Sequence, residues 1–500
     1  MTIILFSILS AILLILIILP LNLGILAWIA LVPLFISLNK IKKAKTAFFI
    51  GLLVGIITYS GLFYWVCSFK IWVFLVIVAT FSSFMAIFCY FTKVVWQRKN
   101  PCLSILFPPF LWLTLQYLYD IIPTGLGGFW ANLGYSQINY LRLLQIIDIT
   151  GIPFITFLIV GINSIICFSI LPYFRKTALK LGVIGLIGLI GLIGYSSRGV
   201  TSDRGATSIE KAKEIKVACI QANFYQSWQW RKTHVDEILE TYTKLTRQAK
   251  KKFDPEFILW PEYAISTDLL HNPIYYEKLS KLAKEVNSYI VLGSFTCEKE
   301  RMYNIVLVFS DKGELVSKAG EHDIIHRKIL PVPFGETQVS SGGDYLPFET
   351  KFGKVGIIIC YEDTFPQIAT RMCRAGAEYL FFLANDGHFR KTNEPRLHAM
   401  MSTLRAIENR RFVVRVANTG ITKTIDPFGK QVLGTIYEPD KDITFKDIET
   451  TKNTRQIFLT EIIPVSNLTI YTRFGDIFTL FSLIVTMGII GHISRIKPII

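Results

Sequence analysis

Eight long apolar runs constrain this chain more than any other feature of its sequence. They cover residues 3–19, 24–39, 46–66, 71–92, 102–119, 152–173, 179–196 and 477–494. A helix of about 20 mostly apolar residues can cross a bilayer, and a mean hydropathy of +0.43 is high for a soluble chain of 500 residues. We therefore predict an α-helical membrane bundle of about eight transmembrane helices. The first run lacks a basic start and a small-residue cleavage site, which predicts a retained span rather than a signal peptide.

Basic residues gather in the short segments that join the apolar runs. The clusters are Lys40, Lys42, Lys43 and Lys45; Lys93, Arg98 and Lys99; Arg175, Lys176 and Lys180; and Arg495 and Lys497. In an eight-span chain all four clusters fall on one side, and basic loops stay cytoplasmic. The region 197–475 is then predicted to face outward, which is the periplasmic side of a bacterial inner membrane.

The net charge of +16 does not indicate a nucleic-acid partner. Lipid headgroups and membrane topology account for the basic loops, and no basic stripe is interleaved with aromatic residues. The eight cysteines form no C-x-x-C pair, so the sequence predicts neither a disulfide framework nor a metal site. We expect no cofactor.

From Ile215 onward the pattern changes to short β-rich runs separated by polar helical stretches. The predicted strands are 216–220, 257–260, 289–293, 305–309, 355–360, 379–383 and 412–416, and the predicted helices lie near 233–251, 275–286, 364–375 and 398–410. Alternating strands and helices are typical of an α/β domain. The predicted organisation is a membrane domain at 1–196, a linker at 197–214, an α/β domain at 215–475, and a final helix with its tail at 476–500.

Three segments of the α/β region carry reactive residue types. An apolar strand runs into Trp260, Pro261 and Glu262; a Pro- and Gly-containing loop joins Lys328 to Glu336; and a second apolar strand ends on Cys360, followed by Tyr361 and Glu362. Functional side chains of α/β sheets tend to lie at the carboxyl ends of strands. A thiol is a good acyl-transfer nucleophile once a base removes its proton, which predicts Cys360 as nucleophile, Glu262 as base and Lys328 as the group that stabilises an oxyanion. Taken singly, each of these residues is more often structural, so the interpretation depends on their combination.

These segments together resemble the Glu–Lys–Cys triad of the nitrilase superfamily, and the whole chain resembles its membrane-embedded branch, the apolipoprotein N-acyltransferase family. Further matching motifs are Phe129-Trp130, Gly134–Gln137, Gln221–Asn223, Gln226–Trp230, Asn385-Asp386, Arg405-Ala406, Glu408, Arg411, Asn418–Gly420 and Tyr471–Gly475. The resemblance implies an αββα sandwich for the α/β domain. It also implies that Glu336 and Glu362 support the lysine or the site, without dividing these roles. Trp230, Tyr361 and His388 become candidate substrate-binding residues.

The resemblance implies a ping-pong acyl transfer. Cys360 would take an acyl chain from a membrane phospholipid as a thioester and pass it to the N-terminal amino group of the lipid-modified cysteine of an apolipoprotein; the enzyme is expected to be a monomer. The chain departs from the family pattern at Leu330, where a His is usual, and at His388, where a Trp is usual, and the stretch 337–359 is short.

Two other interpretations remain open from the sequence. One is a membrane-tethered carbon–nitrogen hydrolase that uses the same triad with water as acceptor. The other is an inactive membrane scaffold or transporter, although transporters usually carry ionisable residues inside their spans and the spans here carry almost none.

Overall fold

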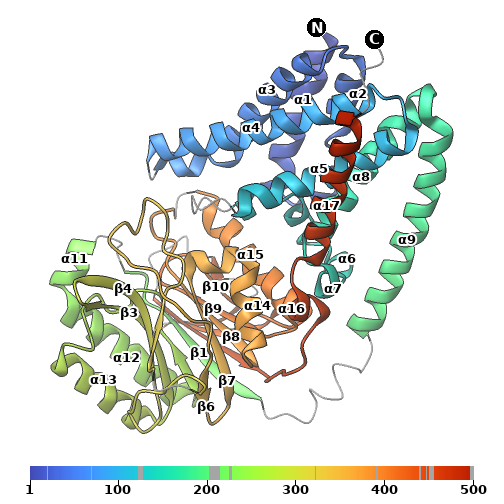
Figure 1. Ribbon diagram of the computed structural model, residues 1–500. Coiled ribbons are helices and arrows are strands. Elements are labelled where there is room, and N and C mark those ends of the chain that lie inside the picture. Colours follow the sequence, from blue (N-terminus) through green and yellow to red (C-terminus); the bar gives the residue numbers. More distant parts are fainter. Residues whose placement is uncertain are drawn as a thin grey trace. The chain divides into compact units, whose positions relative to one another are not determined.

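The computed structural model describes residues 1–19, 21–68, 70–121, 128–201, 214–224, 228–320, 323–389, 392–438, 441–445, 448–449 and 455–495 (Figure 1). The chain divides into two compact units, one formed by Met1–Thr201 with Phe474–Ile500 and the other by Ser202–Arg473. Helix α9 reaches Thr201, so the first residues of the predicted linker are helical. Residues 202–213 of that linker lie outside the described residues.

The first unit is helical, as predicted. Its longer helices are α1 (Thr2–Ile18), α2 (Val32–Lys40), α3 (Ala44–Leu62), α4 (Ile71–Trp96), α5 (Pro101–Ile121), α8 (Pro153–Ile170), α9 (Arg175–Thr201) and α17 (Ile477–Arg495). Each predicted apolar run overlaps one of them. Within the described residues, five helices are long and apolar enough to cross a membrane, namely α3, α4, α5, α8 and α17, while Thr2–Ile18 and Gly24–Lys40 are shorter apolar helices. The predicted number of eight spans is not confirmed and stays a prediction.

The second predicted run is broken, and a buried polar side chain compensates for the break. A 3₁₀ turn at Gly24–Trp28 precedes α2, which has a proline in its first turn. Asn163 of α8 accepts hydrogen bonds from the backbone N–H groups of Leu31 at 2.8 Å and Val32 at 3.2 Å, and it donates to the carbonyl of Ala27 at 2.8 Å. Backbone groups without water need partners of this kind, so Asn163 permits irregular backbone inside the apolar unit.

The second unit contains two β-sheets. The first sheet has the order β13-β12-β15-β1-β2-β3-β4-β5, and the second has β11-β10-β9-β8-β7-β6 with β14 paired to β10. The strands are β1 (Ile215–Gln221), β2 (Phe257–Leu259), β3 (Tyr289–Glu298), β4 (Arg301–Phe309), β5 (Ile325–Arg327), β6 (Phe348–Thr350), β7 (Gly353–Ile359), β8 (Tyr379–Ala384), β9 (Val413–Ala417), β10 (Ile421–Ile425), β11 (Gln431–Val432), β12 (Gly434–Glu438), β13 (Lys441–Phe445), β14 (Ile448–Glu449) and β15 (Gln456–Ile462). The central strands β1, β2 and β3 pair in parallel, as do β7, β8 and β9.

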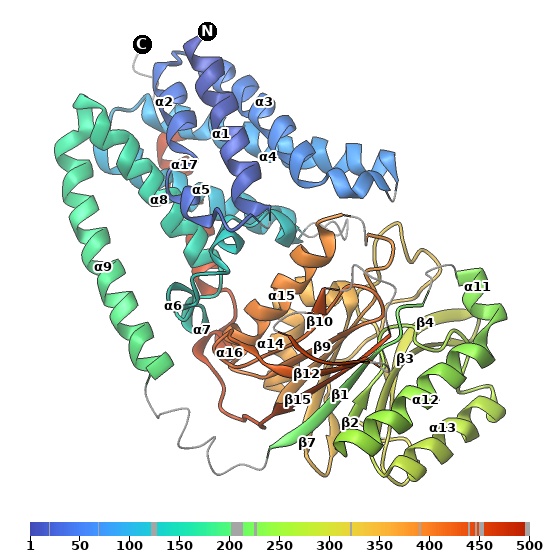
Figure 2. The same ribbon diagram turned by 180° about the vertical axis from the view of Figure 1, so that it is seen from behind.

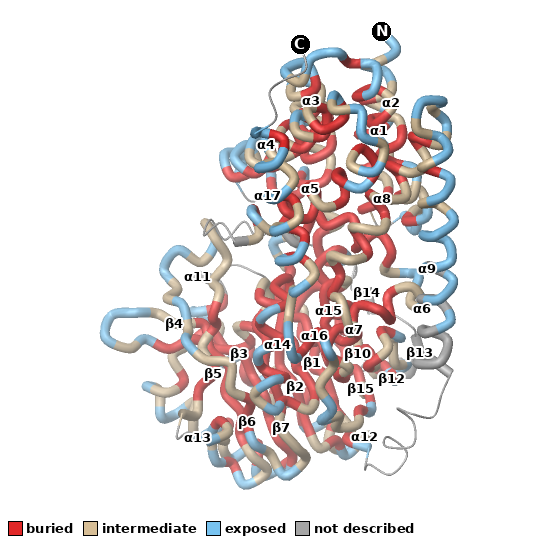
Figure 3. Tube along the Cα trace, turned by 45° about the vertical axis from the view of Figure 1, so that its right-hand side comes forward, coloured by how far each residue is buried: buried red, intermediate tan, exposed pale blue. Residues whose placement is uncertain are grey.

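Alternate side chains of the central strands pack on opposite faces, which gives the unit two cores. Ala218 and Ile220 of β1 face the helices α12 (Val235–Phe253) and α13 (Pro273–Val286). Val217 and Cys219 face the second sheet. Helices α14 (Pro366–Arg374) and α15 (Glu394–Asn409) pack on the second sheet. The layers are therefore helix, sheet, sheet and helix (Figure 2), with buried residues concentrated in the strands (Figure 3). This confirms the predicted α/β sandwich.

Candidate active site

Glu262 follows β2, where close packing leaves its backbone little freedom. The preceding Trp260 stacks on Tyr242 with ring centroids 4.7 Å apart and donates from Nε1 to Thr246 at 3.0 Å. Gly293 of β3 packs closely against the backbone of Glu262. A Cβ atom at position 293 would lie only 2.7 Å from the Cα of Glu262. The side chain of Glu262 is only 5% exposed. The strand end therefore holds a carboxyl group in a nearly dry position.

Lys328 follows β5 and lies between two carboxyl groups. Its Nζ atom is 2.9 Å from Oε1 of Glu262 and 2.8 Å from Oε2 of Glu336, and its side chain is fully buried. We call Glu262, Lys328 and Glu336 the catalytic cluster, after the catalytic roles predicted for Glu262 and Lys328, which stay predictions. The structure thus brings together three residues that are 66 and 8 positions apart in the sequence.

Asn304 of β4 joins the two carboxyl groups, and no sequence motif singles it out. Its Nδ2 atom donates to Glu262 at 2.8 Å and to Glu336 at 3.0 Å, and its backbone carbonyl accepts from the N–H of Lys328 at 2.8 Å. Glu336 also accepts from the hydroxyl of Tyr263 at 3.0 Å and from the N–H of Val332 at 2.7 Å. Glu336 therefore has more donors than Glu262.

This difference separates the acidities of the two glutamates. Burial raises the pKa of the Glu262 carboxyl above its ordinary value, although Lys328 opposes the change. Burial alone would also raise the pKa of Glu336, but Lys328 and the hydrogen bonds from Val332 and Asn304 lower it. Burial alone would lower the pKa of Lys328, yet the two carboxyl groups raise it well above its ordinary value. Pairs of carboxyl groups with divergent pKa values typically divide the acid–base roles, and here Glu262 is the one suited to exchange a proton.

Cys360 follows β7 and has a left-handed backbone, with φ of 51°. Such a conformation costs a non-glycine residue about 1–2 kcal/mol. Burial and the nearby Glu262 raise the pKa of the Cys360 thiol well above its ordinary value, while Lys328 and a hydrogen bond from the N–H of Asn385 oppose this shift. The resting thiol is therefore protonated and needs a base before it can act as a nucleophile.

Glu362 supports the backbone rather than the side chain of the lysine. One of its oxygens accepts from the N–H groups of Ile329 and Leu330, the second at 3.3 Å, and the other accepts from Ile359 at 2.7 Å. Because Ile329 follows the lysine and Ile359 precedes the cysteine, Glu362 joins the two active-site segments. The structure thus separates the two supporting glutamates: Glu336 contacts the ammonium group, and Glu362 contacts the backbone.

The short stretch 337–359 packs against the lysine segment. The N–H of Gly342 donates to the carbonyl of Lys328 at 2.6 Å, and that of Ser340 donates to Met302 at 2.7 Å. A second buried lysine, Lys318, forms ion pairs with Asp344 of this stretch and, at 3.1 Å, with Asp323. In this chain the stretch therefore supports the lysine backbone through direct hydrogen bonds.

The structure gives less information on the three predicted substrate-binding residues than on the catalytic cluster. Tyr361 is half-buried and packs edge-on against Phe365, with ring centroids 5.1 Å apart. His388 is exposed on the segment after β8. The side chain of Trp230 lies outside the described residues. Their roles in substrate binding stay predictions.

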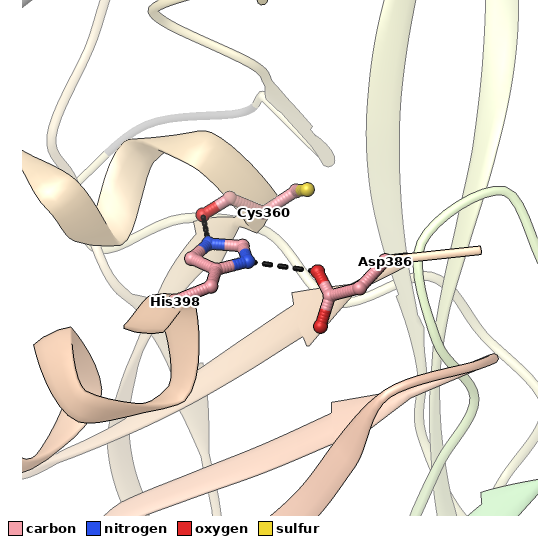
Figure 4. Close-up of side chains that lie close together, drawn as sticks. All are labelled: Cys360, Asp386 and His398. Carbon is pink, nitrogen blue, oxygen red and sulfur yellow. Dashed lines mark hydrogen bonds and ion pairs between the residues drawn. The ribbon is translucent and has the colours of Figure 1, made fainter. Parts of the chain in front are cut away.

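Among the described residues, one group of side chains has the composition of a metal site. Ligand atoms of Cys360, Asp386 and His398 lie within 4.8 Å of one another (Figure 4). Both ring nitrogens of His398, however, already face carboxylates, at 2.9 Å from Asp363 and 2.7 Å from Asp386. The guanidinium of Arg415 contacts the same Asp386 at 3.1 Å. A metal ion would have to displace this cation, so the donor set fits an ion-pair cluster better than a metal site.

Several family-like motifs have structural roles. Arg405 pairs with Glu408 at 2.9 Å inside the second unit. Arg411 donates to the carbonyls of Ala377 at 2.7 Å and Asn467 at 2.8 Å, which anchors the segment before the final helix. These contacts explain buried arginines without assigning them a part in catalysis.

Comparison with known proteins defines the class of the second unit and then the family of the chain. A family model described as carbon-nitrogen hydrolase matches residues 216–454. This places the second unit in the carbon–nitrogen hydrolase class, in agreement with its two-sheet fold. A model described as apolipoprotein N-acyltransferase N-terminal domain matches residues 10–165.

Curated relatives extend the match over both units. The apolipoprotein N-acyltransferase of Geobacter metallireducens is 31% identical over 434 residues, which cover 81% of each chain. That of Chlorobaculum tepidum is 26% identical and covers 95% of this chain and 92% of its own. That of Wigglesworthia glossinidia brevipalpis is 25% identical, with 92% and 91% covered. The chain belongs to the apolipoprotein N-acyltransferase family, which confirms the resemblance and the predicted acyltransferase class. Its apolar helices agree with a multi-pass protein of the bacterial inner membrane.

Proposed function

We propose that this chain transfers a fatty acyl chain from a membrane phospholipid to the N-terminal amino group of the lipid-modified cysteine of apolipoproteins. The observation that carries the proposal is the catalytic cluster, whose Glu262 and Lys328 interact electrostatically with the strand-end thiol of Cys360, in a chain whose other unit is built of apolar helices. Both substrates are lipids, and moving an acyl chain into water costs about 0.8 kcal/mol per methylene. A site attached to membrane helices avoids that cost.

In the first half-reaction, Glu262 takes the proton of the Cys360 thiol, and the thiolate attacks the carbonyl carbon of a phospholipid ester. Lys328 stabilises the negative oxygen of the tetrahedral intermediate. The carbon–oxygen ester bond then breaks, Glu262 returns the proton to the departing alkoxide, and a lysophospholipid leaves. The acyl chain remains on Cys360 as a thioester.

In the second half-reaction, the amino group of the acceptor attacks the thioester carbonyl. Glu262 takes a proton from the nitrogen, the carbon–sulfur bond breaks, and the proton passes to the sulfur of Cys360. The product is an amide, and the enzyme returns to its starting state. Glu336 fixes the lysine ammonium throughout, and Glu362 fixes the backbone that carries it.

The membrane arrangement belongs to the same proposal. The four basic clusters lie at ends of predicted spans, which supports eight spans with the catalytic domain on the periplasmic side. The predicted domain limits of 1–196 and 215–475, the monomeric state and the substrate contacts of Trp230, Tyr361 and His388 are proposed together with it.

An acylation assay tests the proposal. Purified full-length protein is incubated with phosphatidylethanolamine and phosphatidylglycerol vesicles and a diacylated lipopeptide, and products are measured by mass spectrometry. We expect an N-acylated peptide and an acyl adduct on Cys360, both lost in Cys360→Ala and Cys360→Ser. Cys297→Ala, which removes an exposed thiol of β3, is the matched control and should retain activity. Release of free fatty acid without N-acylated peptide would instead support a hydrolase, and an adduct on another residue would contradict the assignment of Cys360.

A further inference from the structure

A second buried group of charges lies beside Cys360, and the mechanism above does not use it. We call it the His398 cluster; its members are Asp363, Asp386, Glu394, His398 and Arg415. All five side chains are at most 5% exposed. Burying this many ionisable groups is expensive unless they are paired, so the arrangement calls for an explanation beyond simple packing.

The cluster comes from four elements that meet behind the nucleophile. Asp363 lies in the turn after Cys360, Asp386 follows β8, His398 lies on α15 and Arg415 lies on β9. His398 is held from both sides, at 2.9 Å from Asp363 and 2.7 Å from Asp386. Arg415 in turn contacts Asp363 at 2.7 Å and Asp386 at 3.1 Å.

The contact between His398 and the nucleophile is through the backbone. Nε2 of His398 lies 3.2 Å from the carbonyl oxygen of Cys360. Figure 4 shows this carbonyl facing His398, with the thiol directed to the other side. The imidazole is therefore placed to hold the main chain of Cys360, and it is not placed as the base of a Cys–His pair.

Two observations connect this contact to reactivity. Cys360 has a left-handed backbone, which a non-glycine residue keeps only when its surroundings enforce it. The thiol also receives a hydrogen bond from the N–H of Asn385, the residue next to Asp386. The same cluster thus fixes the carbonyl of Cys360 and the segment that contacts its sulfur.

The protonation of the cluster supports an imidazolium at this position. Burial and Arg415 would lower the pKa of His398, but Asp363 and Asp386 raise it to about 10. Burial and Asp386 raise the pKa of Glu394 to about 8. Near neutral pH, two carboxylates then face two cations, and a neutral Glu394 lies 3.7 Å from the imidazole. Nε2 can donate to the Cys360 carbonyl, with Asp363 at 2.9 Å beside it, while Nδ1 faces both Asp386 at 2.7 Å and the Arg415 guanidinium at 2.9 Å.

We propose that His398 is a positioning residue for Cys360, which holds the carbonyl group of the nucleophile and thereby the left-handed turn that directs the thiol towards the Asn385 amide. The proposal rests on the proposed function only in taking Cys360 as the nucleophile. It assigns His398 no contact with substrate and no proton transfer.

Two substitutions of His398 distinguish the role of Nε2 from the role of Nδ1. In His398→Gln the side-chain amide can place a donor near the position of Nε2, whereas in His398→Asn the shorter side chain keeps a donor only near Nδ1. We expect thioester formation to be slowed by about 10- to 100-fold in His398→Asn, since a misplacement of about 1 Å can cost this much. His398→Gln should be closer to wild type. Equal rates in all three proteins, or a slower rate in His398→Gln than in His398→Asn, would overturn the proposal.

Alkylation of Cys360 by iodoacetamide gives a readout that needs no lipid. The rate at a fixed pH is followed by peptide mass spectrometry, with the exposed Cys297 of the same molecule as internal control. We expect the rate at Cys360 to fall in the same order as thioester formation and the rate at Cys297 to stay constant. If wild type alkylates but forms no thioester, the proposed function fails, and the alkylation order still decides the role of His398.

A third variant covers the case in which His398 substitutions prevent folding. Asp386→Asn keeps the shape of a residue that holds the imidazole but removes its charge. Thermal unfolding establishes that this variant is folded, and its alkylation rate at Cys360 should then differ from that of wild type. An unchanged rate in a folded Asp386→Asn protein would contradict the proposal.

Discussion

Two buried charge clusters act on Cys360, and each holds one carboxyl group more than it has cations. In the catalytic cluster one ammonium lies between two carboxyl groups; in the His398 cluster two cations face three carboxyl groups. In both, one carboxyl group has a raised pKa, Glu262 in the first and Glu394 in the second. Glu262 acts electrostatically on the thiol, whereas Glu394 faces an imidazole. The two clusters thus share a carboxyl group of raised pKa, and they differ in what that group lies near: the thiol in the first cluster and an imidazole in the second.

Replacing the central cation of the catalytic cluster should have the largest effect. Lys328→Met removes the group that stabilises the oxyanion and leaves two carboxyl groups together, so thioester formation should fall by at least about 100- to 1000-fold. Quantitative mass spectrometry of the acyl-enzyme measures this.

Lys318 provides a matched control, because it is also fully buried between two carboxylates. Lys318→Met should lower the melting temperature and retain most of the acylation. Equal losses of acylation in both variants would show that Lys328 acts through stability.

Gly293 tests how closely Glu262 must be placed. In Gly293→Ala the new Cβ would lie 2.7 Å from the Cα of Glu262, so this strand end must shift. We expect a destabilisation of about 1–3 kcal/mol, as is usual for overpacking, together with a clear loss of kcat. Gly343→Ala is the control, because a Cβ at that position would meet nothing within 4 Å. A normal kcat in Gly293→Ala would indicate that the position of Glu262 is not critical.

Glu336 should influence the proton affinity of Glu262. Its negative charge raises the pKa of Glu262. The base must be ionised, so the acidic limb of kcat/KM falls as pH drops through the pKa of Glu262. Glu336→Gln removes the repulsion and should move this limb to lower pH, with a folded protein of reduced turnover. If the acidic limb of kcat/KM instead moves to higher pH in Glu336→Gln, the limb reports the ionisation of a group other than Glu262.

Asn304 should have the opposite influence. Its hydrogen bond favours the ionised form of Glu262 and so lowers the pKa. In Asn304→Leu this bond is lost, and the acidic limb of kcat/KM should move to higher pH. The two variants thus form a pair with opposite signs, and shifts in the same direction would contradict the proposed geometry.

Glu394 should affect stability more than rate. Its pKa in the fold, about 8, lies above the ordinary value of 4.5. Its contribution to stability is therefore complete below pH 4.5 and is lost as pH rises through about 8. Glu394→Gln stays neutral, so its melting temperature should fall less than that of wild type between about pH 6 and about pH 9. Equal falls would show that Glu394 does not take up this proton.

Glu262 and Cys360 could be predicted from the sequence because each follows a recognisable apolar run, whereas Lys328 follows the three-residue strand β5 and was predicted from the proline- and glycine-containing loop that joins it to Glu336. Asn304 could not be predicted, because it lies inside the strand β4 among apolar neighbours and its partners are far away in the sequence. The division between Glu336 and Glu362 also needed the structure, since Glu362 contacts backbone atoms that carry no sequence signal.

In the fold, too, the elements with a local sequence pattern could be predicted, and those that depend on distant partners could not. The seven predicted strands and four predicted helices of the α/β domain are present with small shifts at their ends. The short strands β5 and β6 were missed because three residues do not establish an alternation. Strands β10 to β14 were missed because they are only two to five residues long and rich in polar residues, whereas β15 was missed although Ile457, Phe458 and Leu459 give it an apolar run. Their identity as strands depends on pairing with distant partners.

The position of β15 has a consequence for how the protein is made. This strand lies between β12 and β1, and it pairs with a strand that left the ribosome about 240 residues earlier. Until β15 is synthesised, one side of β1 remains an unpaired edge that could pair with another chain. The final helix α17 begins at Ile477, 15 residues after β15 ends at Ile462. Completion of the sheet thus precedes synthesis of the final helix by only a short stretch of chain, and a chain that stopped before residue 456 would carry Glu262 and Lys328 on an open, aggregation-prone sheet.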